Sequence, residues 1–298
     1  MKQSAGKPIS RRQAVVSIAA ASAGTLIEPT SIFCAPSKDK LRVAVIGDWG
    51  TGEEDQFSIA RQMFASHRRE PFDFVITAGD NIYPDGNGRH FIKKFERPFA
   101  DLIKDRINFY ATLGNHDVYS GREDQRQYNL FNMGGQRYYR LSKGEGLAEF
   151  FMLDSTDFDS SQSVWLEDSL RASCAKWKIA VFHHPIYSSG KKHGPSVGLR
   201  KRLEPLFIRY GVNAAFSGHD HIYERAKPQQ GVYYFVTGAG GKLRRGNVDM
   251  KSSTREASYD QDNHFMLIEI DDKQMAFQSI SETGSVVDSG SILAVISR

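Results

Sequence analysis

Residues 41–50 read LRVAVIGDWG, a run of aliphatic residues that ends in a glycine and an aspartate. The same order returns at residues 73–83, which read DFVITAGDNIY, and at residues 107–117, which read INFYATLGNHD. Each apolar run has the length of a buried strand and is followed by a polar turn led by glycine. Because open α/β sheets bind ligands at the carboxyl ends of their strands, we expect these turns to meet at one functional site.

Later segments repeat this pattern with histidines. Residues 177–184 read WKIAVFHH, and residues 212–221 read VNAAFSGHDH. The predicted strands are 41–46, 73–78, 107–113, 147–153, 177–182, 212–216, 232–237 and 264–270, and the predicted helices are 55–68, 89–104, 122–131, 162–173 and 197–210. Alternating strands and helices predict an α/β fold with parallel strands in its first half. The tail, 264–296, has closely spaced strands around the turn Glu282-Thr283-Gly284, which predicts antiparallel hairpins.

The composition is typical of a globular protein and excludes fibrous and disordered classes. The chain has 298 residues, of which 40% are hydrophobic and 25% charged. The formal net charge is +4, but residues 41–298 contain equal numbers of acidic and basic side chains, so the excess lies in residues 1–40. An even balance gives no support for a nucleic-acid-binding surface. Two cysteines, Cys34 and Cys174, are too few for a disulfide framework, and if Cys34 lies in a cleaved segment, Cys174 is expected to be a buried or inert thiol.

The first forty residues have the pattern of a bacterial export signal. Arg11 and Arg12 precede the apolar run 14–27, which is shorter than the ~20 residues that a membrane span needs. The paired arginines favour the twin-arginine type. We expect an export signal and short linker over 1–40 and a single domain over 41–298, exported to the periplasm or secreted, with no stable membrane association after cleavage. The alternative is a disordered basic N-terminus.

The polar side chains that follow the strands form a set of metal donors. They comprise two carboxylates, a phenol, an amide and three imidazoles: Asp48, Asp80, Tyr83, Asn115, His183, His219 and His221. The set contains hard and borderline donors without a thiolate, too many for one ion and suited to two ions that share a bridging carboxylate. Taken singly, His219 could be an ordinary loop histidine and Asp48 a turn cap. Five such turns in order, each directly after a strand, argue against coincidence.

The series GDWG, GDNIY, GNHD, FHHP and GHDH resembles the calcineurin-like metallophosphoesterases. Tyr83 in GDNIY narrows the resemblance to the purple acid phosphatases, and Gly47-Asp48-Trp49-Gly50 is similar to the small, tartrate-resistant type 5-like enzymes. The similarity extends from Leu41 to about Ile280. It implies an α/β fold, a four-layer sandwich in which two mixed β-sheets pack face to face and are flanked by helices.

The resemblance also implies the role of each donor. Asp48, Tyr83 and His221 would hold a ferric ion, and Asp80 would bridge to a second metal. Asn115, His183 and His219 would complete a site for Fe(II), Zn(II) or Mn(II). His183 rather than His184 takes the family's position at the end of the strand, so His184 is expected to support the site without binding a metal. Charge transfer from Tyr83 to Fe(III) would make the protein purple.

The implied reaction is hydrolysis of phosphate monoesters by a metal-bound hydroxide, without a phosphoenzyme. His116 and His193 are the candidate catalytic residues, since His116 adjoins Asn115 and His193 lies in the loop that supplies a second histidine in the family. His193 could instead be a solvated loop residue. Residues 154–162 are shorter than the mammalian-type cover loop, which predicts an open site and broad specificity. Small phosphate esters are the expected partners of a monomer.

Two alternatives stay open at this point. The first is a Mn- or Zn-dependent phosphodiesterase or nucleotide pyrophosphatase of the same fold, and Tyr83 counts against it. The second is a metal- or phosphate-binding protein that has lost turnover. The complete set of donors counts against this second alternative.

Overall fold

The computed structural model describes residues 40–294. Apart from Lys40, the expected export signal lies outside the described residues, so it stays a prediction. Within the described part of the chain, no helix has the length and apolar character needed to cross a bilayer. Cys174 is disulfide-bonded in this structure. The lone thiol expected after removal of Cys34 stays a prediction, because it concerns a cleaved chain.

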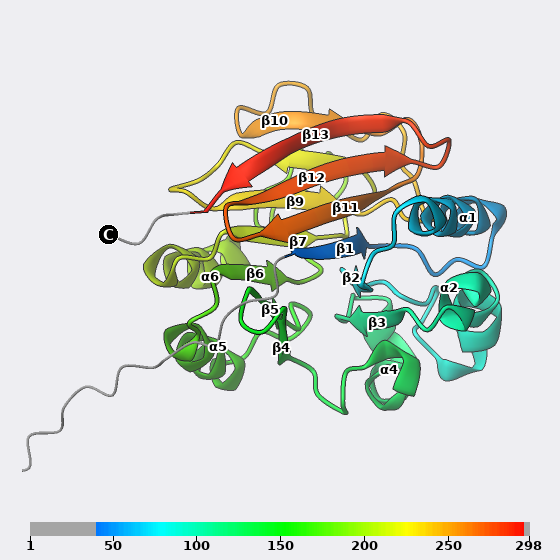
Figure 1. Ribbon diagram of the computed structural model, residues 1–298, viewed down its shortest axis with the longest axis horizontal. Coiled ribbons are helices and arrows are strands. Elements are labelled where there is room, and N and C mark those ends of the chain that lie inside the picture. Colours follow the sequence, from blue (N-terminus) through cyan, green and yellow to red (C-terminus); the bar gives the residue numbers. More distant parts are fainter. Residues whose placement is uncertain (1–39, 295–298) are drawn as a thin grey trace, which may run out of the picture. The chain divides into compact units, whose positions relative to one another are not determined.

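The first sheet has six strands in the order β13-β12-β11-β1-β2-β3 (Figure 1). Its parallel half consists of β1 (Lys40–Ile46), β2 (Phe74–Thr77) and β3 (Asn108–Ala111). The carboxyl ends of these three strands therefore lie at the same edge of the sheet. The parallel pairing expected for the first half of the chain is confirmed.

The C-terminal strands complete this sheet with antiparallel pairing. They are β11 (His264–Asp271), β12 (Gln274–Ser281) and β13 (Val286–Leu293), and β11 pairs with β1. The turn between β12 and β13 contains Gly284, whose φ of 85° is accessible to glycine at little cost. The expected C-terminal hairpins are thus confirmed.

The second sheet has seven strands in the order β10-β8-β9-β7-β6-β5-β4. Its parallel strands are β5 (Ala148–Met152), β6 (Trp177–Val181), β7 (Ala214–Ser217) and β9 (Tyr233–Thr237). Three antiparallel strands were not expected from the sequence: β4 (Tyr139–Lys143), β8 (Tyr223–Ala226) and β10 (Arg255–Tyr259). The edge strands β4 and β10 bury no residue completely, and β8 carries Glu224 and Arg225, so none has the apolar run of a central strand.

The strand β1 shows how alternation builds the layers. Val43 and Val45 belong to the core between the two sheets, together with Ile179 of β6. Ala44 and Ile46, which point to the opposite face, belong to the core beneath the helices. Successive side chains on a strand point to opposite faces, and both faces of β1 are buried.

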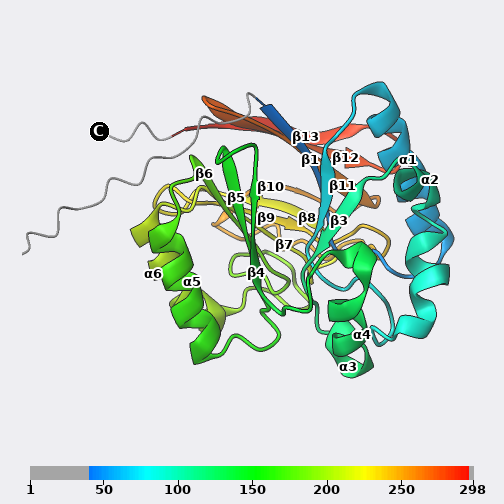
Figure 2. The ribbon, with the colours of Figure 1, turned by 60° about the horizontal axis from the view of Figure 1, so that its bottom comes forward.

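Helices cover the outer face of each sheet (Figure 2). The helices α1 (Glu54–Arg69) and α2 (Ala100–Lys104) contribute Ile59 and Leu102 to the core against the first sheet. The helices α5 (Ser160–Ala172) and α6 (Val197–Tyr210) contribute Leu170 and Phe207 to the core against the second. These layers confirm the expected sandwich of two mixed sheets flanked by helices.

The helix expected over 89–104 is wrong as a continuous element. The chain forms a 3₁₀ turn at Gly88–His90, a π-helical turn at Ile92–Glu96, and then α2. The amide of Arg97 donates to the carbonyl of Ile92, and the next residue, Pro98, has no N–H to continue the helix. Proline therefore separates the π-helical turn from α2.

The helix expected over 122–131 is also interrupted. It divides into α4 (Arg122–Gln127) and a 3₁₀ turn at Asn129–Phe131, and α3 (Asp117–Ser120) precedes it. Tyr128 between them adopts an extended conformation and packs its ring 4.2 Å from that of Phe91. Tyr128 therefore packs its half-buried ring on Phe91 and does not continue the helix.

Candidate metal centre

All seven expected donors come from loops at the carboxyl ends of parallel strands. Asp48 follows β1, Asp80 and Tyr83 follow β2, Asn115 follows β3, His183 follows β6, and His219 and His221 follow β7. Three of them, Asp48, Asp80 and His219, have positive φ values of 55°, 51° and 69°. Non-glycine residues in this conformation are uncommon and gather at functional sites. The two sheets thus bring the expected donors together.

Asp48, Tyr83 and His221 form the first donor cluster. Tyr83 Oη lies 3.1 Å from Asp48 Oδ1 and 3.4 Å from His221 Nε2, and these last two atoms lie 3.4 Å apart. Neighbouring ligands of one ion, each about 2.1 Å from it, lie about 3 Å from each other. The spacing of this cluster therefore suits one metal ion.

Asn115, His183 and His219 form the second donor cluster. His183 Nε2 lies 3.1 Å from Asn115 Oδ1 and 3.2 Å from His219 Nδ1. Asp80 Oδ1 is 3.4 Å from the same His183 Nε2. The carboxylates of Asp48 and Asp80 and a ring nitrogen of His183 all lie within 4.8 Å of one another. Asp80 therefore lies where a carboxylate shared by two metals would lie.

The tautomer of His183 supports a cation at this position. Its Nδ1 donates to the carbonyl oxygen of Ala78 at 2.9 Å, so Nε2 of the neutral ring presents a lone pair. Asn115 Oδ1 and Asp80 Oδ1 are also acceptors and face this nitrogen. Three buried or half-buried lone pairs that converge without a proton between them fit a metal ion.

Burial disfavours the charged forms of the side chains in the first donor cluster. It raises the pKa of Asp48 well above its ordinary range, and the Asp80 carboxylate raises it further. Burial also raises the pKa of Tyr83, with Asp48 and Asp80 adding to the effect. Conversely, the pKa of His221 is lowered to about 3, mainly by burial and then by the positive charges of Arg244 and Lys242. Neutral imidazoles are the metal-binding form, and a multivalent cation would stabilise the buried anions.

Backbone groups hold the acidic donors in place. The amide of His219 donates to Asp48 Oδ2 at 2.7 Å, and the amide of His116 donates to Asp80 Oδ1 at 2.9 Å. A Cβ on Gly79 would lie 2.7 Å from Nδ1 of His183. Glycine at this position lets the turn after β2 approach the imidazole.

Asp117 is a functional residue to which the sequence assigned no role. It is fully buried and accepts hydrogen bonds from the amides of Asn81 and Ile82 at 3.0 Å and of Gly114 at 2.8 Å. Burial, with the charge of Asp80, raises its pKa to about 7. Asp117 therefore ties the turn after β2 to the turn after β3. The only available signal was its place directly after Gly114-Asn115-His116.

The two expected catalytic histidines both lie at the cluster. The ring of His116 packs 4.6 Å from that of Tyr83, and its Nδ1 donates to the carbonyl of Pro84 at 2.7 Å, which leaves Nε2 available. The ring of His193 lies 4.3 Å from that of His219. His184 is also close, since its ring lies 4.5 Å from His219, and its Nδ1 is hydrogen-bonded to Ser155 Oγ at 2.9 Å.

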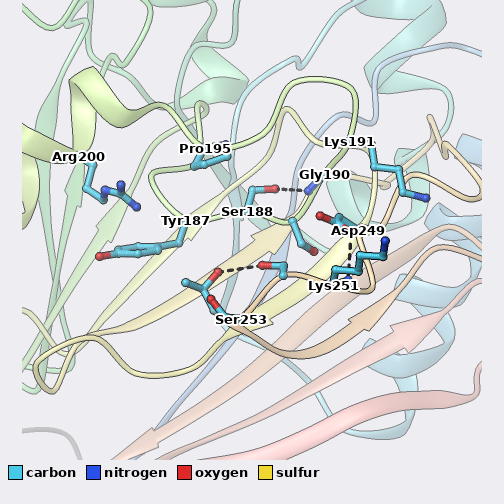
Figure 3. Close-up of a pocket in the computed structure, with 12 residues that line it drawn as sticks. Tyr187, Ser188, Gly190, Lys191, Pro195, Arg200, Asp249, Lys251 and Ser253 are labelled. Carbon is cyan, nitrogen blue, oxygen red and sulfur yellow. Dashed lines mark hydrogen bonds between the residues drawn. The ribbon is translucent and has the colours of Figure 1, made fainter.

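The segment that carries His193 also lines a polar cavity of about 650 Å³ (Figure 3). Its walls include Ser188, Lys191, Pro195 and Arg200. Ser188 donates to Asp220 Oδ2 at 2.5 Å, and Asp220 lies between the donors His219 and His221. The cavity therefore adjoins the metal cluster but contains none of the seven donors.

Comparison with known proteins places this geometry in a family. The model of the calcineurin-like phosphoesterase family matches residues 41–223, a span that includes all seven donors. Rat tartrate-resistant acid phosphatase type 5 is 29% identical over 87% of this chain and 92% of its own length. Purple acid phosphatase 17 of Arabidopsis thaliana is 31% identical over 73% of this chain and 74% of its own length.

Two solved structures share the fold. The purple acid phosphatase PPD1 from yellow lupin superposes with a TM-score of 0.73 at 19% identity, covering 86% of this chain and 54% of that one. GAP50, described as the anchor in the inner membrane complex of Plasmodium, superposes with a TM-score of 0.77 at 22% identity, covering 87% and 90%. At such identities the likeness concerns the fold alone.

The chain belongs to the calcineurin-like phosphoesterases, and within them to the purple acid phosphatases. It is therefore a hydrolase, a phosphatase with a dimetal site, for which the residues of the two donor clusters are the candidates. The loops that carry these donors contain all the motifs on which the sequence-based expectation rested.

Proposed function

We propose that the protein is an exported acid phosphatase that hydrolyses phosphate monoesters with an Fe(III)–M(II) centre, in which M is iron, zinc or manganese. One observation carries this proposal: the donors divide around Asp80 into an anionic cluster and a neutral cluster of matching spacing. The proposed enzyme acts as a monomer on small phosphate esters. Export is proposed from Arg11, Arg12 and the apolar run that follows them.

The charge of the donors supports this assignment of metals. A carboxylate and a phenolate, from Asp48 and Tyr83, are hard anionic ligands that stabilise a ferric ion. The second cluster offers an amide oxygen and two neutral imidazoles, which suit a divalent ion. Asp80 would be shared between the two ions.

The two ions, when bound, supply positive charge for the phosphate and an activated water molecule as the nucleophile. The protein groups around them handle the proton. His116, held through Nδ1 by its hydrogen bond to the Pro84 carbonyl, would act in its imidazolium form and give the Nε2 proton to the departing alkoxide, which leaves the ring neutral. General-acid assistance of this kind contributes roughly 10²- to 10⁴-fold to the rate. His193, beside His219, is the second group able to bind a phosphate oxygen.

The visible absorption spectrum tests the proposal most directly. Protein expressed with iron should be purple, and Tyr83→Phe should lose the band together with ferric iron. Tyr234→Phe is the matched control, because Tyr234 is also buried and its hydroxyl has no hydrogen-bond partner among residues 40–294. Loss of colour in Tyr83→Phe alone supports the ferric assignment.

Substrate choice distinguishes the alternatives of the same fold. The proposed enzyme should have a higher kcat/KM for p-nitrophenyl phosphate than for bis(p-nitrophenyl) phosphate. A colourless protein that contains manganese or zinc and prefers the diester would instead be the phosphodiesterase. A protein that binds two metals and hydrolyses neither ester would be a binding protein without turnover.

A further inference from the structure

The loop after β9 brings two cations to the first donor cluster. The amide of Gly240 donates to the carbonyl of Gly47 at 2.9 Å, and the amide of Arg244 donates to the carbonyl of His221 at 3.0 Å. Both ends of the short segment 240–244 are thus fixed to the loops that carry Asp48 and His221. Lys242 lies between these two anchors and is held beside the metal donors.

Lys242 lies over the ring of Tyr83. Its Nζ is 3.8 Å from the ring centroid, a close cation–π contact. The side chain is half-buried, and within residues 40–294 it forms no ion pair with an acidic residue. Lys94 also lies at this tyrosine and donates to the carbonyl of Tyr83 at 2.5 Å.

Arg244 is the other cation of the loop after β9, and like Lys242 it has no acidic partner among residues 40–294. The side chain is half-buried, and its Nη1 is inaccessible to solvent and has no hydrogen-bond partner in the described part of the chain. A buried donor without a partner costs free energy, so the protein itself satisfies the Arg244 guanidinium incompletely.

The neighbouring Arg245 behaves differently. Its Nη2 lies 3.6 Å from Asp262 Oδ1, and its side chain is exposed. Arginine and lysine side chains on surface loops normally have such solvent or acidic partners. Lys242 and Arg244 thus differ from Arg245 in both burial and pairing.

A count of charges indicates what these two cations bind. Asp48, Asp80 and the phenolate of Tyr83 offset three of the five positive charges of the proposed metal pair. A phosphate monoester dianion and the hydroxide formed from the activated water carry three more negative charges, so the site with Lys242 and Arg244 retains one positive charge that another anionic group on the substrate would offset. Building on the proposed function, we infer that Lys242 and Arg244 form a second anion subsite, and that the enzyme prefers phosphate esters whose leaving group carries another negative group.

Two substrates that differ in one group provide the test. Glycerol 3-phosphate and 3-phosphoglycerate have the same phosphate ester, but the second has a carboxylate in place of a terminal alcohol. The measured quantity is the ratio of kcat/KM for 3-phosphoglycerate to kcat/KM for glycerol 3-phosphate. It is determined with the full, metal-loaded chain, and each variant's metal content and visible spectrum are recorded.

The wild-type ratio should exceed one, and Lys242→Met/Arg244→Met should lower it at least tenfold, mainly through KM, because two charge-assisted contacts are lost. Raising the salt concentration should lower the ratio in the wild type and not in the double variant. Arg244→Lys should retain much of the preference, and Arg245→Met should leave the ratio within twofold. A double variant whose ratio stays within twofold of the wild type would overturn the subsite.

A binding measurement separates this inference from the proposed function. If the wild type hydrolyses neither ester, the proposed function fails, and calorimetric binding of 3-phosphoglycerate then tests the subsite. Binding at least tenfold tighter to the wild type than to the double variant supports the subsite. Equal affinities, or an equal loss for glycerol 3-phosphate, overturn it, because the cations would then contact nothing or only the common phosphate.

Discussion

The two donor clusters have similar spacing and different charge. In the first, Tyr83 Oη lies 3.1 Å from Asp48 Oδ1, and in the second, His183 Nε2 lies 3.1 Å from Asn115 Oδ1. The first cluster has two ionisable oxygens and Lys242 beside them, whereas the second has no acidic donor of its own and is surrounded by further imidazoles. Spacing alone provides places for two ions. The difference in charge is the reason for which we propose a different valence for each ion.

Asp80 is common to both clusters, so Asp80→Asn should have the largest effect. Loss of the shared negative charge should lower kcat by about 10³-fold or more and should reduce the metal content below two ions. Phosphatase assays and elemental analysis measure the two effects. Asp101→Asn, an exposed position on α2, is the control. Full activity in Asp80→Asn would show that the clusters do not share a ligand.

His116 packs on Tyr83 and therefore belongs to the side of the first cluster. His116→Ala should lower kcat by about 10²-fold while both metals remain bound, since His116 is assigned to proton transfer rather than to metal binding. Steady-state kinetics with elemental analysis checks this, with His90→Ala as a histidine outside the site. An unchanged kcat would remove His116 from the proposed role.

Asn115→Asp would make the second cluster resemble the first. An anionic oxygen in place of the amide should raise the affinity for the second ion and increase the share of ferric iron, with kcat lowered about tenfold. Iron oxidation state can be measured by Mössbauer spectroscopy, and Asn129→Asp provides an exposed control. If metal content and valence are the same as in the wild type, donor charge is not what distinguishes the clusters.

Asp117 ties together the turns of the two clusters without belonging to either. Asp117→Asn should lower the free energy of unfolding by about 1–3 kcal/mol, because a buried acceptor of backbone amides is replaced by a group that also donates. The loss of activity should be smaller than for the donors, within about tenfold. Chemical denaturation measures the first effect, and Asp124→Asn, on the exposed face of α4, is the comparison. Equal stabilities would mean that the turns are held by other contacts.

The place of the candidate donors could be predicted because each lies in the turn that follows a buried strand. Asp48 comes two residues after β1 and His183 two residues after β6, so a local pattern fixes their place at the sheet edge. The role of Asp117 could not be predicted, since it depends on amides from a turn 35 residues away. The same holds for Lys242, whose contact with Tyr83 depends on the packing of the glycine-rich loop after β9.

The elements that the sequence predicted wrongly or missed also depend on features that the periodicity of apolar residues does not show. The break of the helix expected over 89–104 follows from Pro98, which a periodicity argument weighs too little. The end of α4 at Gln127 follows from burial of the ring of Tyr128 against Phe91, a tertiary contact. The edge strands β4 and β10 are held by pairing with one neighbour and lack the apolar run by which central strands are recognised.

The donors come from both sheets, and this has a consequence for assembly. The amide of His219, after β7, donates to the carboxylate of Asp48, after β1, although the two residues are 171 positions apart in the chain. The first cluster needs the loops after β1, β2 and β7, and the second needs those after β3, β6 and β7, so both clusters form only when the two sheets have packed together. Metal binding then adds its free energy to the folded state alone, and the unfolding midpoint should rise with metal concentration. For this chain, the candidate metal centre also reports on whether the two sheets have packed together.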